Sequence, residues 1–267
     1  MRMEELEPDV LVFRGDAYQS VATAFVHGRE VLLVDALASR ADAGWMRREL
    51  EEVLGKGVRV IVVTHYMSDH VAGLALFPGA RIVAHRYCEH TFFGQRGRSP
   101  EDDASFVPPT EVVDEGMTLE WGRRRLSILH NPGKTLCALA VDVPSLDLVL
   151  TGDAVVGNTA YLSSSVPALV RGAIERLERL GRSRIVPGHI GVFPSSALGN
   201  ARRYLDALGA RVAAARREGR VESLRTVRIE ECLAPGVVPT EFEREWHGRN
   251  LKVVLERRLF AADWGLP

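Results

Sequence analysis

Two histidines and an aspartate stand together in the segment Thr64-His65-Tyr66-Met67-Ser68-Asp69-His70. The segment follows the apolar run from Val58 to Val63, which is short and β-branched and therefore predicts a buried strand. In open α/β sheets, ligands bind at the carboxyl ends of the strands. Imidazole and carboxylate groups together form a donor set for zinc, manganese or iron. A solvated, histidine-rich loop is the alternative for this segment taken alone.

Three later segments also place polar side chains at the ends of predicted strands. They are His130-Asn131-Pro132-Gly133-Lys134-Thr135, Thr151-Gly152-Asp153-Ala154 and Ile185-Val186-Pro187-Gly188-His189. Glycine or proline in each segment permits a sharp turn and a close approach of the backbone. One such segment is weak evidence, whereas four in this order strongly indicate a shared site.

The elements that must position these side chains alternate between strands and helices in two similar halves. The expected strands are Val10–Arg14, Val21–His27, Glu30–Asp35, Val58–Val63 and Arg81–Ala84, then Glu111–Val113, Met117–Trp121, Arg124–His130, Leu136–Val143, Asp147–Thr151 and Arg184–Val186. The expected helices are Ala41–Leu54, one starting within Val71–Leu76, Val166–Leu180, Ser195 to about Arg217, and Phe242–Leu259. This order favours the α/β class, with helices covering two sheets in a four-layer αββα sandwich.

The segment from His85 to Pro109 differs from its surroundings, because it is rich in glycine and proline and carries three phenylalanines. Long loops inside a compact domain are often functional. We interpret it either as a mobile flap over a pocket or as a surface excursion that is pinned by its own aromatic side chains.

Composition limits the classes of function. The 267 residues carry a net charge of −1, which gives no reason to expect nucleic-acid binding. Three cysteines far apart in the sequence indicate reduced thiols, and the first ten residues lack the apolar segment of a secretory signal. No apolar run approaches the length of a membrane span. We therefore expect a cytoplasmic protein that acts on a small-molecule substrate without membrane or nucleic-acid partners, and homo-oligomerisation stays open.

From about residue 10 to 193, the chain resembles the metallo-β-lactamase superfamily, in its glyoxalase-II-like hydrolase branch. The resemblance implies a single αββα domain, here residues 1–267 with a C-terminal helical segment from about 195 to 267. It also implies a metal site at one edge between the two sheets. The family's motifs are His-x-His-x-Asp-His, Pro-Gly-His-Thr, Gly-Asp and Pro-Gly-His. Carried over by position, they give the ligands His65, Asp69, His70, Asp153 and His189.

The sequence departs from the family pattern at Met67 and Lys134, each of which stands where the family has a histidine. Both missing ligands belong to the same metal position, which retains only His65 and Asp153, too few for a closed tetrahedral site. The other position keeps Asp69, His70, His189 and the shared Asp153. The resemblance therefore implies one ion, zinc by family default with iron or manganese as alternatives, and a bound water.

We expect a metal-dependent hydrolase of a small ester, thioester, lactone or related acyl compound, in which the bound water attacks. Asp69 would orient that water or take its proton, and Lys134 would pair with Asp153 and stabilise an oxyanion. The alternative is a non-catalytic protein of the same fold that has lost part or all of its metal site.

Several other polar residues are weaker candidates. Asp35 ends a strand near the expected site and would orient a ligating histidine. His130 is interpreted as a strand-end histidine, and Trp246, His247 and Asn250 as packed residues of the last helix. Contacts to a ligand from His85 or His90, from Tyr18 or from Tyr161 stay open.

Overall fold

The computed structural model describes residues 1–95 and 104–260. Within this part of the chain, the first sheet has seven strands in the order β1-β2-β3-β4-β5-β6-β7. Its strands are β1 (Arg2–Glu7), β2 (Val10–Arg14), β3 (Val21–His27), β4 (Glu30–Val34), β5 (Gly57–Val62), β6 (Arg81–His85) and β7 (Glu111–Val113). The first four strands pair antiparallel, and β4 to β7 pair parallel. The sheet is therefore mixed, with β4 and β5 ending at the same edge.

The second sheet of the described residues has six strands in the order β13-β12-β11-β10-β9-β8. Its strands are β8 (Gly116–Trp121), β9 (Arg124–His130), β10 (Leu139–Val143), β11 (Leu148–Gly152), β12 (Arg184–Pro187) and β13 (Phe193–Pro194). Only β11 and β12 pair parallel among these strands. Their connection runs through helix α5 (Pro167–Glu178), so their carboxyl ends lie side by side.

Alternation along the strands creates three separate layers of core. On β10, Leu139 and Val141 face the first sheet, whereas Ala140 faces helices on the outer side. On β4, Leu32 packs between the sheets and Leu33 packs outward. Because successive side chains of a strand point to opposite faces, apolar strands of this kind bury both faces of each sheet. The predicted αββα sandwich is thereby confirmed.

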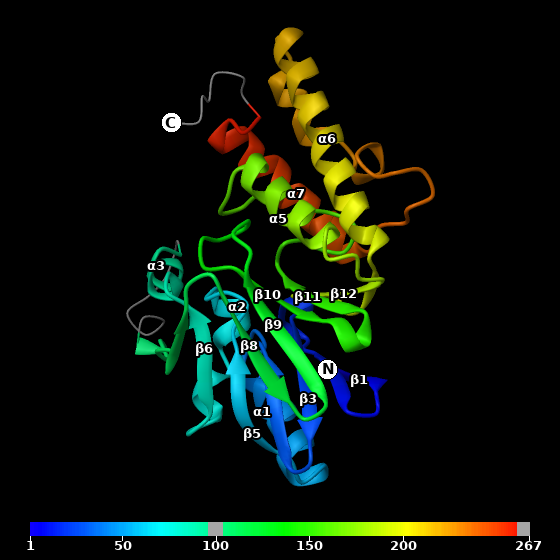
Figure 1. Cartoon of the computed structure of the whole chain (residues 1–267). Helices are drawn as coiled ribbons and strands as arrows, with labels where there is room; N and C mark the ends of the chain where they lie inside the picture. The colour runs from blue at the N-terminus through cyan, green and yellow to red at the C-terminus, as the bar shows by residue number, and fades with distance from the viewer. Residues whose placement is uncertain (96–103, 261–267) are drawn as a thin grey trace.

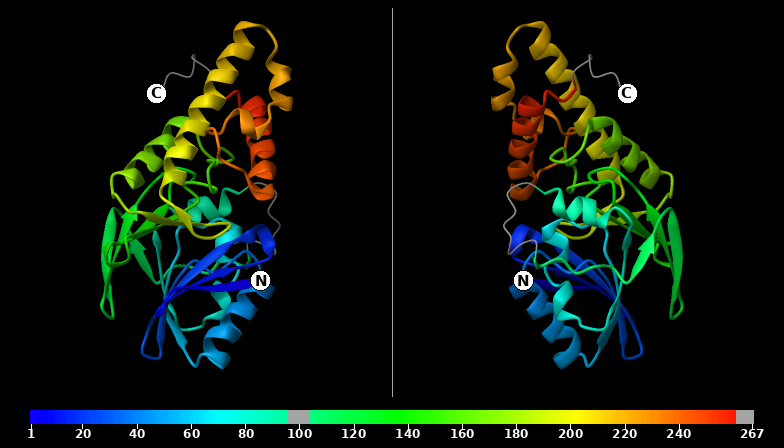
Figure 2. Two further views of the ribbon diagram at one scale, coloured as in Figure 1. Left: turned by 90° about the vertical axis from the view of Figure 1, so that its right-hand side faces the viewer. Right: turned by 90° about the vertical axis from the view of Figure 1, so that its left-hand side faces the viewer.

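Helices complete the two outer layers. Over the first sheet lie α1 (Arg40–Arg48), which continues into a π-helical turn at Glu49–Val53, and the short helices α2 (Ser68–Val71) and α3 (Cys88–Phe93). Over β10, β11 and β12 lie α5, α6 (Ser196–Arg217) and α7 (Glu241–Arg257). Figure 1 shows these three helices together beyond the ends of β10–β12, and Figure 2 shows them from both sides. None of the helices in residues 1–95 and 104–260 is long and apolar enough to cross a membrane.

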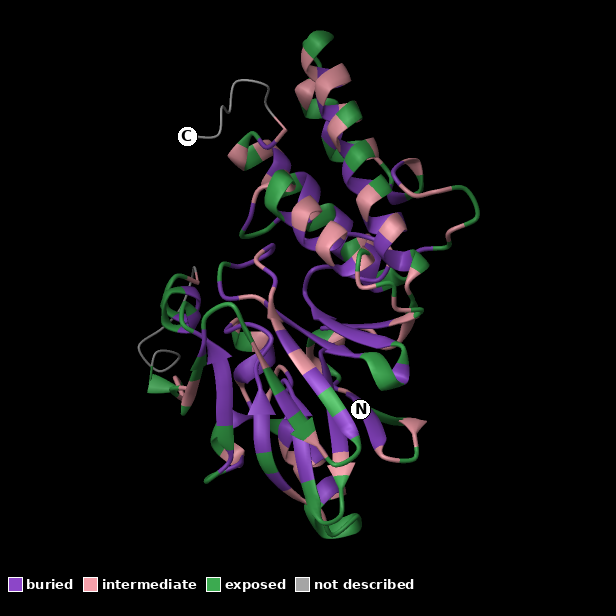
Figure 3. Ribbon diagram, viewed as in Figure 1, coloured by how far each residue is buried: buried purple, intermediate pink, exposed green. Residues whose placement is uncertain are grey.

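The ends of β4, β5, β11 and β12 converge where the two sheets meet the helices. Figure 3 shows that these strand ends and the loops after them are mostly buried. Backbone hydrogen bonds join the sheets there, from Val21 N–H to the Gly188 carbonyl and from Leu139 N–H to the Thr64 carbonyl. This convergence brings the four polar segments of the sequence together.

The segment from 85 to 109 is not a continuous loop. Helix α3 occupies Cys88–Phe93, and Phe92 and Phe106 pack against Tyr66 with ring centroids 6.4 and 5.7 Å away. The Tyr66 hydroxyl donates to the Val107 carbonyl. The aromatic residues therefore pin the described parts of the segment, as the second interpretation expected, and residues 96–103 of the predicted flap lie outside the described residues.

Candidate metal centre

Four side chains from both sheets meet in one cluster. Asp69 and His70 lie on α2 just after β5, Asp153 follows β11, and His189 follows β12. One donor atom from each of the four lies within 4.8 Å of the others, and only Asp69 has appreciable exposure, at 13% of its side chain. The structure thus brings together the four residues that the resemblance assigned to one ion.

The tautomers of two histidines in the cluster follow from their outer partners. His70 Nδ1 lies 2.9 Å from Asp35 Oδ2, and His189 Nδ1 lies 2.7 Å from the Tyr18 carbonyl oxygen. Because a carboxylate and a carbonyl only accept, each Nδ1 carries a proton, and each Nε2 is the ring nitrogen left to bind a metal ion. The two Nε2 atoms face each other across 3.4 Å.

Asp153 lies between two groups of partners. Its Oδ1 is 3.4 Å from both His70 Nε2 and His189 Nε2, and no hydrogen bond from the described residues satisfies this buried oxygen. Its Oδ2 receives a hydrogen bond from the Lys134 ammonium, which is 4% exposed. The expected contact between Lys134 and Asp153 is therefore present.

His65 belongs to the side of Asp153 that Lys134 occupies. Its Nε2 lies 3.4 Å from Asp153 Oδ2 and has no hydrogen-bond partner in the described part of the chain. Its Nδ1 contacts the Thr64 hydroxyl at 3.1 Å. His65 is not one of the four clustered donors. Its role as a ligand stays a prediction.

Strained backbone and glycine hold the donors in place. Asp35 has a φ of +64°, a conformation that L-residues rarely adopt, and its carboxylate accepts hydrogen bonds from the Thr64 amide and hydroxyl as well as from His70. A Cβ atom at Gly188 would lie 2.2 Å from Asp153 Oδ1 and 2.5 Å from a His70 ring carbon. Only glycine leaves room for both side chains at this point.

Charge is concentrated in this small volume. Burial alone would raise the pKa of Asp153, but the Lys134 ammonium and the neighbouring imidazoles hold it well below its usual value. Burial would likewise lower the pKa of His70, but the carboxylates of Asp153, Asp35 and Asp69 hold it well above its usual value. The two shifts have opposite sources: cationic groups favour the charged Asp153 carboxylate, and carboxylates favour the protonated His70 imidazole.

The cluster fits a divalent metal ion. Two imidazole nitrogens and two carboxylates are a donor set for zinc, manganese or iron. A buried Asp153 oxygen without a hydrogen-bond partner among the described residues is costly unless a cation lies beside it. The hydrogen bonds from His70 to Asp35 and from His189 to Tyr18 are of the kind that orients ligating histidines.

Helix α7 supplies an aromatic wall that the sequence did not reveal. The Phe242 ring stacks on His189 with centroids 5.4 Å apart, and Trp246 packs edge-on against Tyr161 at 4.6 Å. The buried Tyr161 hydroxyl has no hydrogen-bond partner within residues 1–95 and 104–260, and burial together with the nearby Asp153 and Asp69 raises its pKa well above the usual value. Trp246 is packed, as expected of this helix, but no local signal placed it or Phe242 beside His189, because these contacts span more than 50 residues of chain.

Other candidate residues lie away from the four donors. His85 and His130 stack at 3.9 Å and donate to the carbonyls of Asp114 and Leu136. His247 and Asn250 join a buried network with the Tyr204 hydroxyl, as expected of packed residues. For His90, the structure provides no contact with the cluster.

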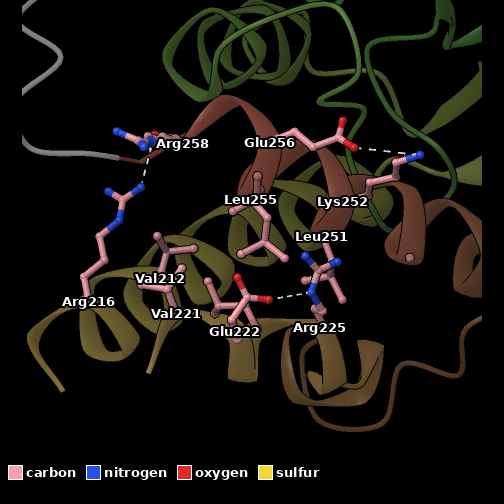
Figure 4. Close-up of a pocket in the computed structure, with 13 residues that line it drawn as sticks. Val212, Arg216, Val221, Glu222, Arg225, Leu251, Lys252, Leu255, Glu256 and Arg258 are labelled. Carbon is pink, nitrogen blue, oxygen red and sulfur yellow. Dashed lines mark hydrogen bonds and ion pairs between the residues drawn. The ribbon is translucent and has the colours of Figure 1, made fainter. Parts of the chain in front are cut away.

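A separate groove lies between α6 and α7. It has a volume of about 920 Å³ and is lined by residues between Val212 and Arg258, from α6, α7 and the turn that joins them. Figure 4 shows two ion pairs among its lining residues, one between Glu222 and Arg225 and one between Glu256 and Lys252. None of its lining residues belongs to the metal cluster, so the groove is separate from the chemistry.

Sequence comparison finds one matching family model. The model described as the metallo-beta-lactamase superfamily matches residues 15–189. No curated protein matches the sequence.

Structure comparison agrees with the family model. A metallo-beta-lactamase from Pontibacter korlensis superposes with a TM-score of 0.65 and 16% identity, covering 77% of this chain and 98% of that one. A metallo-beta-lactamase from Erythrobacter litoralis, with beta-mercaptoethanol in its active site, has a TM-score of 0.63 and 19% identity. The match covers 76% of this chain and 95% of that one. A metallo-beta-lactamase from Hirschia baltica has a TM-score of 0.62 and 16% identity, covering 76% of this chain and 96% of that one. At sequence identities of 16–19%, these structural similarities establish the fold alone.

Proposed function

Because the chain belongs to the metallo-beta-lactamase superfamily, we propose that it is a metal-dependent hydrolase whose ion is held by Asp69, His70, Asp153 and His189. The observation that carries this proposal is the convergence of four donor atoms within 4.8 Å. Two of the donors are imidazoles whose hydrogen bonds already fix the tautomer that a metal requires.

The chemistry follows from the donor set. A bound divalent ion lowers the pKa of a water molecule and polarises a carbonyl oxygen. Asp69 is the most exposed of the four, and His70 and Lys134 keep its pKa low although burial opposes them. Its carboxylate is therefore in the charged form that orients a water molecule or accepts its proton.

The substrate we propose is a small ester, thioester, lactone or related acyl compound. The donors are almost entirely buried, and Phe242 and Trp246 lie against His189. Because Asp69 is the most exposed of the four donors, we expect a small reacting group to approach the centre beside it. Zinc is the ion we expect, and the two carboxylates also suit manganese or iron.

A non-catalytic binding protein is the second candidate. It is favoured by the replacement of two family histidines with Met67 and Lys134, and by the close burial of the centre. Such a protein would bind the metal or a small molecule without turnover.

One experiment separates these functions. The full chain, stripped with a chelator and reloaded with zinc, manganese or iron(II), is assayed against a panel of small aryl esters, thioesters and lactones. We expect metal-dependent turnover that His189→Ala abolishes and that His27→Ala, an exposed histidine on β3, leaves intact. Bound metal without turnover of any of these substrates would favour the binding protein. Turnover that persists in His189→Ala would reject the proposed site.

A further inference from the structure

We propose that the Lys134 ammonium is a built-in cation that replaces a second metal ion, so that the centre holds one ion and Lys134 weakens its binding. This inference rests on the metal-binding part of the proposed function. It does not depend on which substrate is hydrolysed, or on whether any is.

The geometry places Lys134 on the opposite side of Asp153 from the four-donor cluster. Asp153 Oδ1 lies 3.4 Å from the Nε2 atoms of His70 and His189, whereas Oδ2 contacts the Lys134 ammonium. Lys134 Nζ also lies 4.1 Å from the centroid of the Tyr161 ring, a cation–π contact. One carboxylate thus joins a metal-donor set on one oxygen to a fixed ammonium on the other.

The Lys134 side lacks the donors for a second ion. Among the described residues, the contacts of Asp153 Oδ2 bring in one further metal donor, His65, whose Nε2 lies 3.4 Å away. Met67 follows two residues later and offers a thioether, a soft and weak donor. A second dication at this place would have two protein ligands and would meet the ammonium at close range.

A count of formal charge supports a single dication. Asp35, Asp69 and Asp153 carry three negative charges, Lys134 carries one positive charge, and neutral histidines add none, which leaves −2 among these described groups. One divalent ion neutralises this charge. A second would leave a surplus of +2 in a buried place, where unpaired charge is costly.

The ammonium also has a consequence for affinity. Like charges disfavour each other, and a neighbouring unit charge in a buried site shifts an ionic equilibrium by about tenfold or more. Lys134 should therefore weaken metal binding, while it stabilises Asp153 in the metal-free protein. A lysine that merely filled space would have no such effect.

The test measures metal stoichiometry and affinity on the full chain, by native mass spectrometry and by competition with a chromophoric zinc chelator. Wild type should bind one zinc ion per chain. Lys134→Met, which removes the charge and keeps the length, should bind zinc about tenfold more tightly. Lys134→Arg should resemble wild type, because it retains the charge, and Lys252→Met is the control for loss of an exposed lysine.

The double variant Met67→His with Lys134→His provides a second readout. It should move the stoichiometry from one ion towards two, because it restores imidazoles on the His65 side of Asp153. If Lys134→Met does not fold, this variant and the wild-type stoichiometry still decide the matter.

Three results would overturn the inference. They are two zinc ions bound by wild type, a folded Lys134→Met with unchanged or weaker zinc affinity, and a double variant that stays at one ion under excess zinc. The inference fails separately from the proposed function. A chain that binds one ion and hydrolyses nothing supports the inference alone, and a chain that hydrolyses with two ions supports the function alone.

Discussion

Asp35 organises the centre without facing the place of the ion. Its carboxylate accepts from the Thr64 amide at 2.7 Å, from the Thr64 hydroxyl at 2.7 Å and from His70 Nδ1 at 2.9 Å. These contacts connect the end of β4 to the loop after β5. They also keep the Nε2 lone pair of His70 directed at Asp153 and His189.

Replacing Asp35 with asparagine should weaken metal binding. An amide that points its NH₂ at His70 Nδ1 would favour the opposite tautomer, with the proton on Nε2. We expect a loss of affinity of about 10- to 100-fold, the usual effect of removing an outer partner of a ligating histidine. Chelator competition measures it, with Asp114→Asn, an exposed carboxylate paired to Arg86, as the matched control. Equal affinities in the two variants would refute this role.

The convergence of the four clustered side chains could be predicted from the sequence, whereas the aromatic wall around them could not. Asp69, His70, Asp153 and His189 each follow a recognisable apolar strand, and strand ends share an edge. Tyr161 lies in a loop, so no periodicity fixed where its ring would point. The contact of Lys134 with Asp153 was foreseen because a buried carboxylate needs a positive partner once a metal ligand is lost.

Helix α7 is the element that closes the centre. Thr240 caps its first turn by accepting from the Glu243 amide, and the buried Glu243 carboxylate accepts from the Thr240 and Asn158 amides. The helix start is therefore tied to the loop that follows β11 and Asp153. This places Phe242 and Trp246 against His189.

Shortening the aromatic wall should speed metal release. Phe242→Leu removes the ring that stacks on His189, at a cost in stability on the order of 1 kcal/mol. We expect the ion to leave several-fold faster in stopped-flow mixing with a chelator. Phe260→Leu is the control, since Phe260 packs on α6 away from the centre. A release rate that both variants share with wild type would mean that α7 does not gate access.

Elements with strong periodicity were predicted closely, and short ones were not. The predicted strands Val10–Arg14 and Val21–His27 match β2 and β3 to the residue. Strand β1 was missed because its sequence is rich in glutamate and its residues are mostly exposed at the sheet edge. Helix α3 was not predicted, because it has only six residues and the glycines and prolines near it are typical of a loop.

At the scale of the whole molecule, stability should depend on a buried neutral histidine remote from the metal. His247 Nε2 donates to the Val227 carbonyl at 2.9 Å, and Nδ1 accepts from the Tyr204 hydroxyl at 2.9 Å. Burial lowers its pKa below the usual 6.5, although the Val227 carbonyl opposes this. The unfolded chain therefore binds a proton at a higher pH than the folded chain does.

Unfolding free energy should accordingly fall as the pH drops below about 6.5 and be fully retained above it. The measurement is urea denaturation of metal-free protein at pH 8 and pH 5. His247→Gln keeps a donor and an acceptor but has no titrating group, so it should lose less stability than wild type between these values. If both proteins lose the same amount, His247 makes no contribution to the pH dependence.

The fold class followed from the alternation of strands and helices, and the pairing of layers required the structure. Apolar residues on both faces of β4 and β10 indicate burial on two sides, but they do not say which sheet or helix covers each face. Likewise, the sequence does not indicate that the groove lined by α6 and α7 lies apart from the metal cluster.

The most direct test of the metal centre is a crystal structure of the zinc-loaded chain, with anomalous diffraction recorded on both sides of the zinc edge. We predict one anomalous peak, enclosed by Asp69, His70, Asp153 and His189, with Lys134 still in contact with Asp153. An empty cluster under excess zinc, or a second peak with Lys134 displaced from Asp153, would contradict this account.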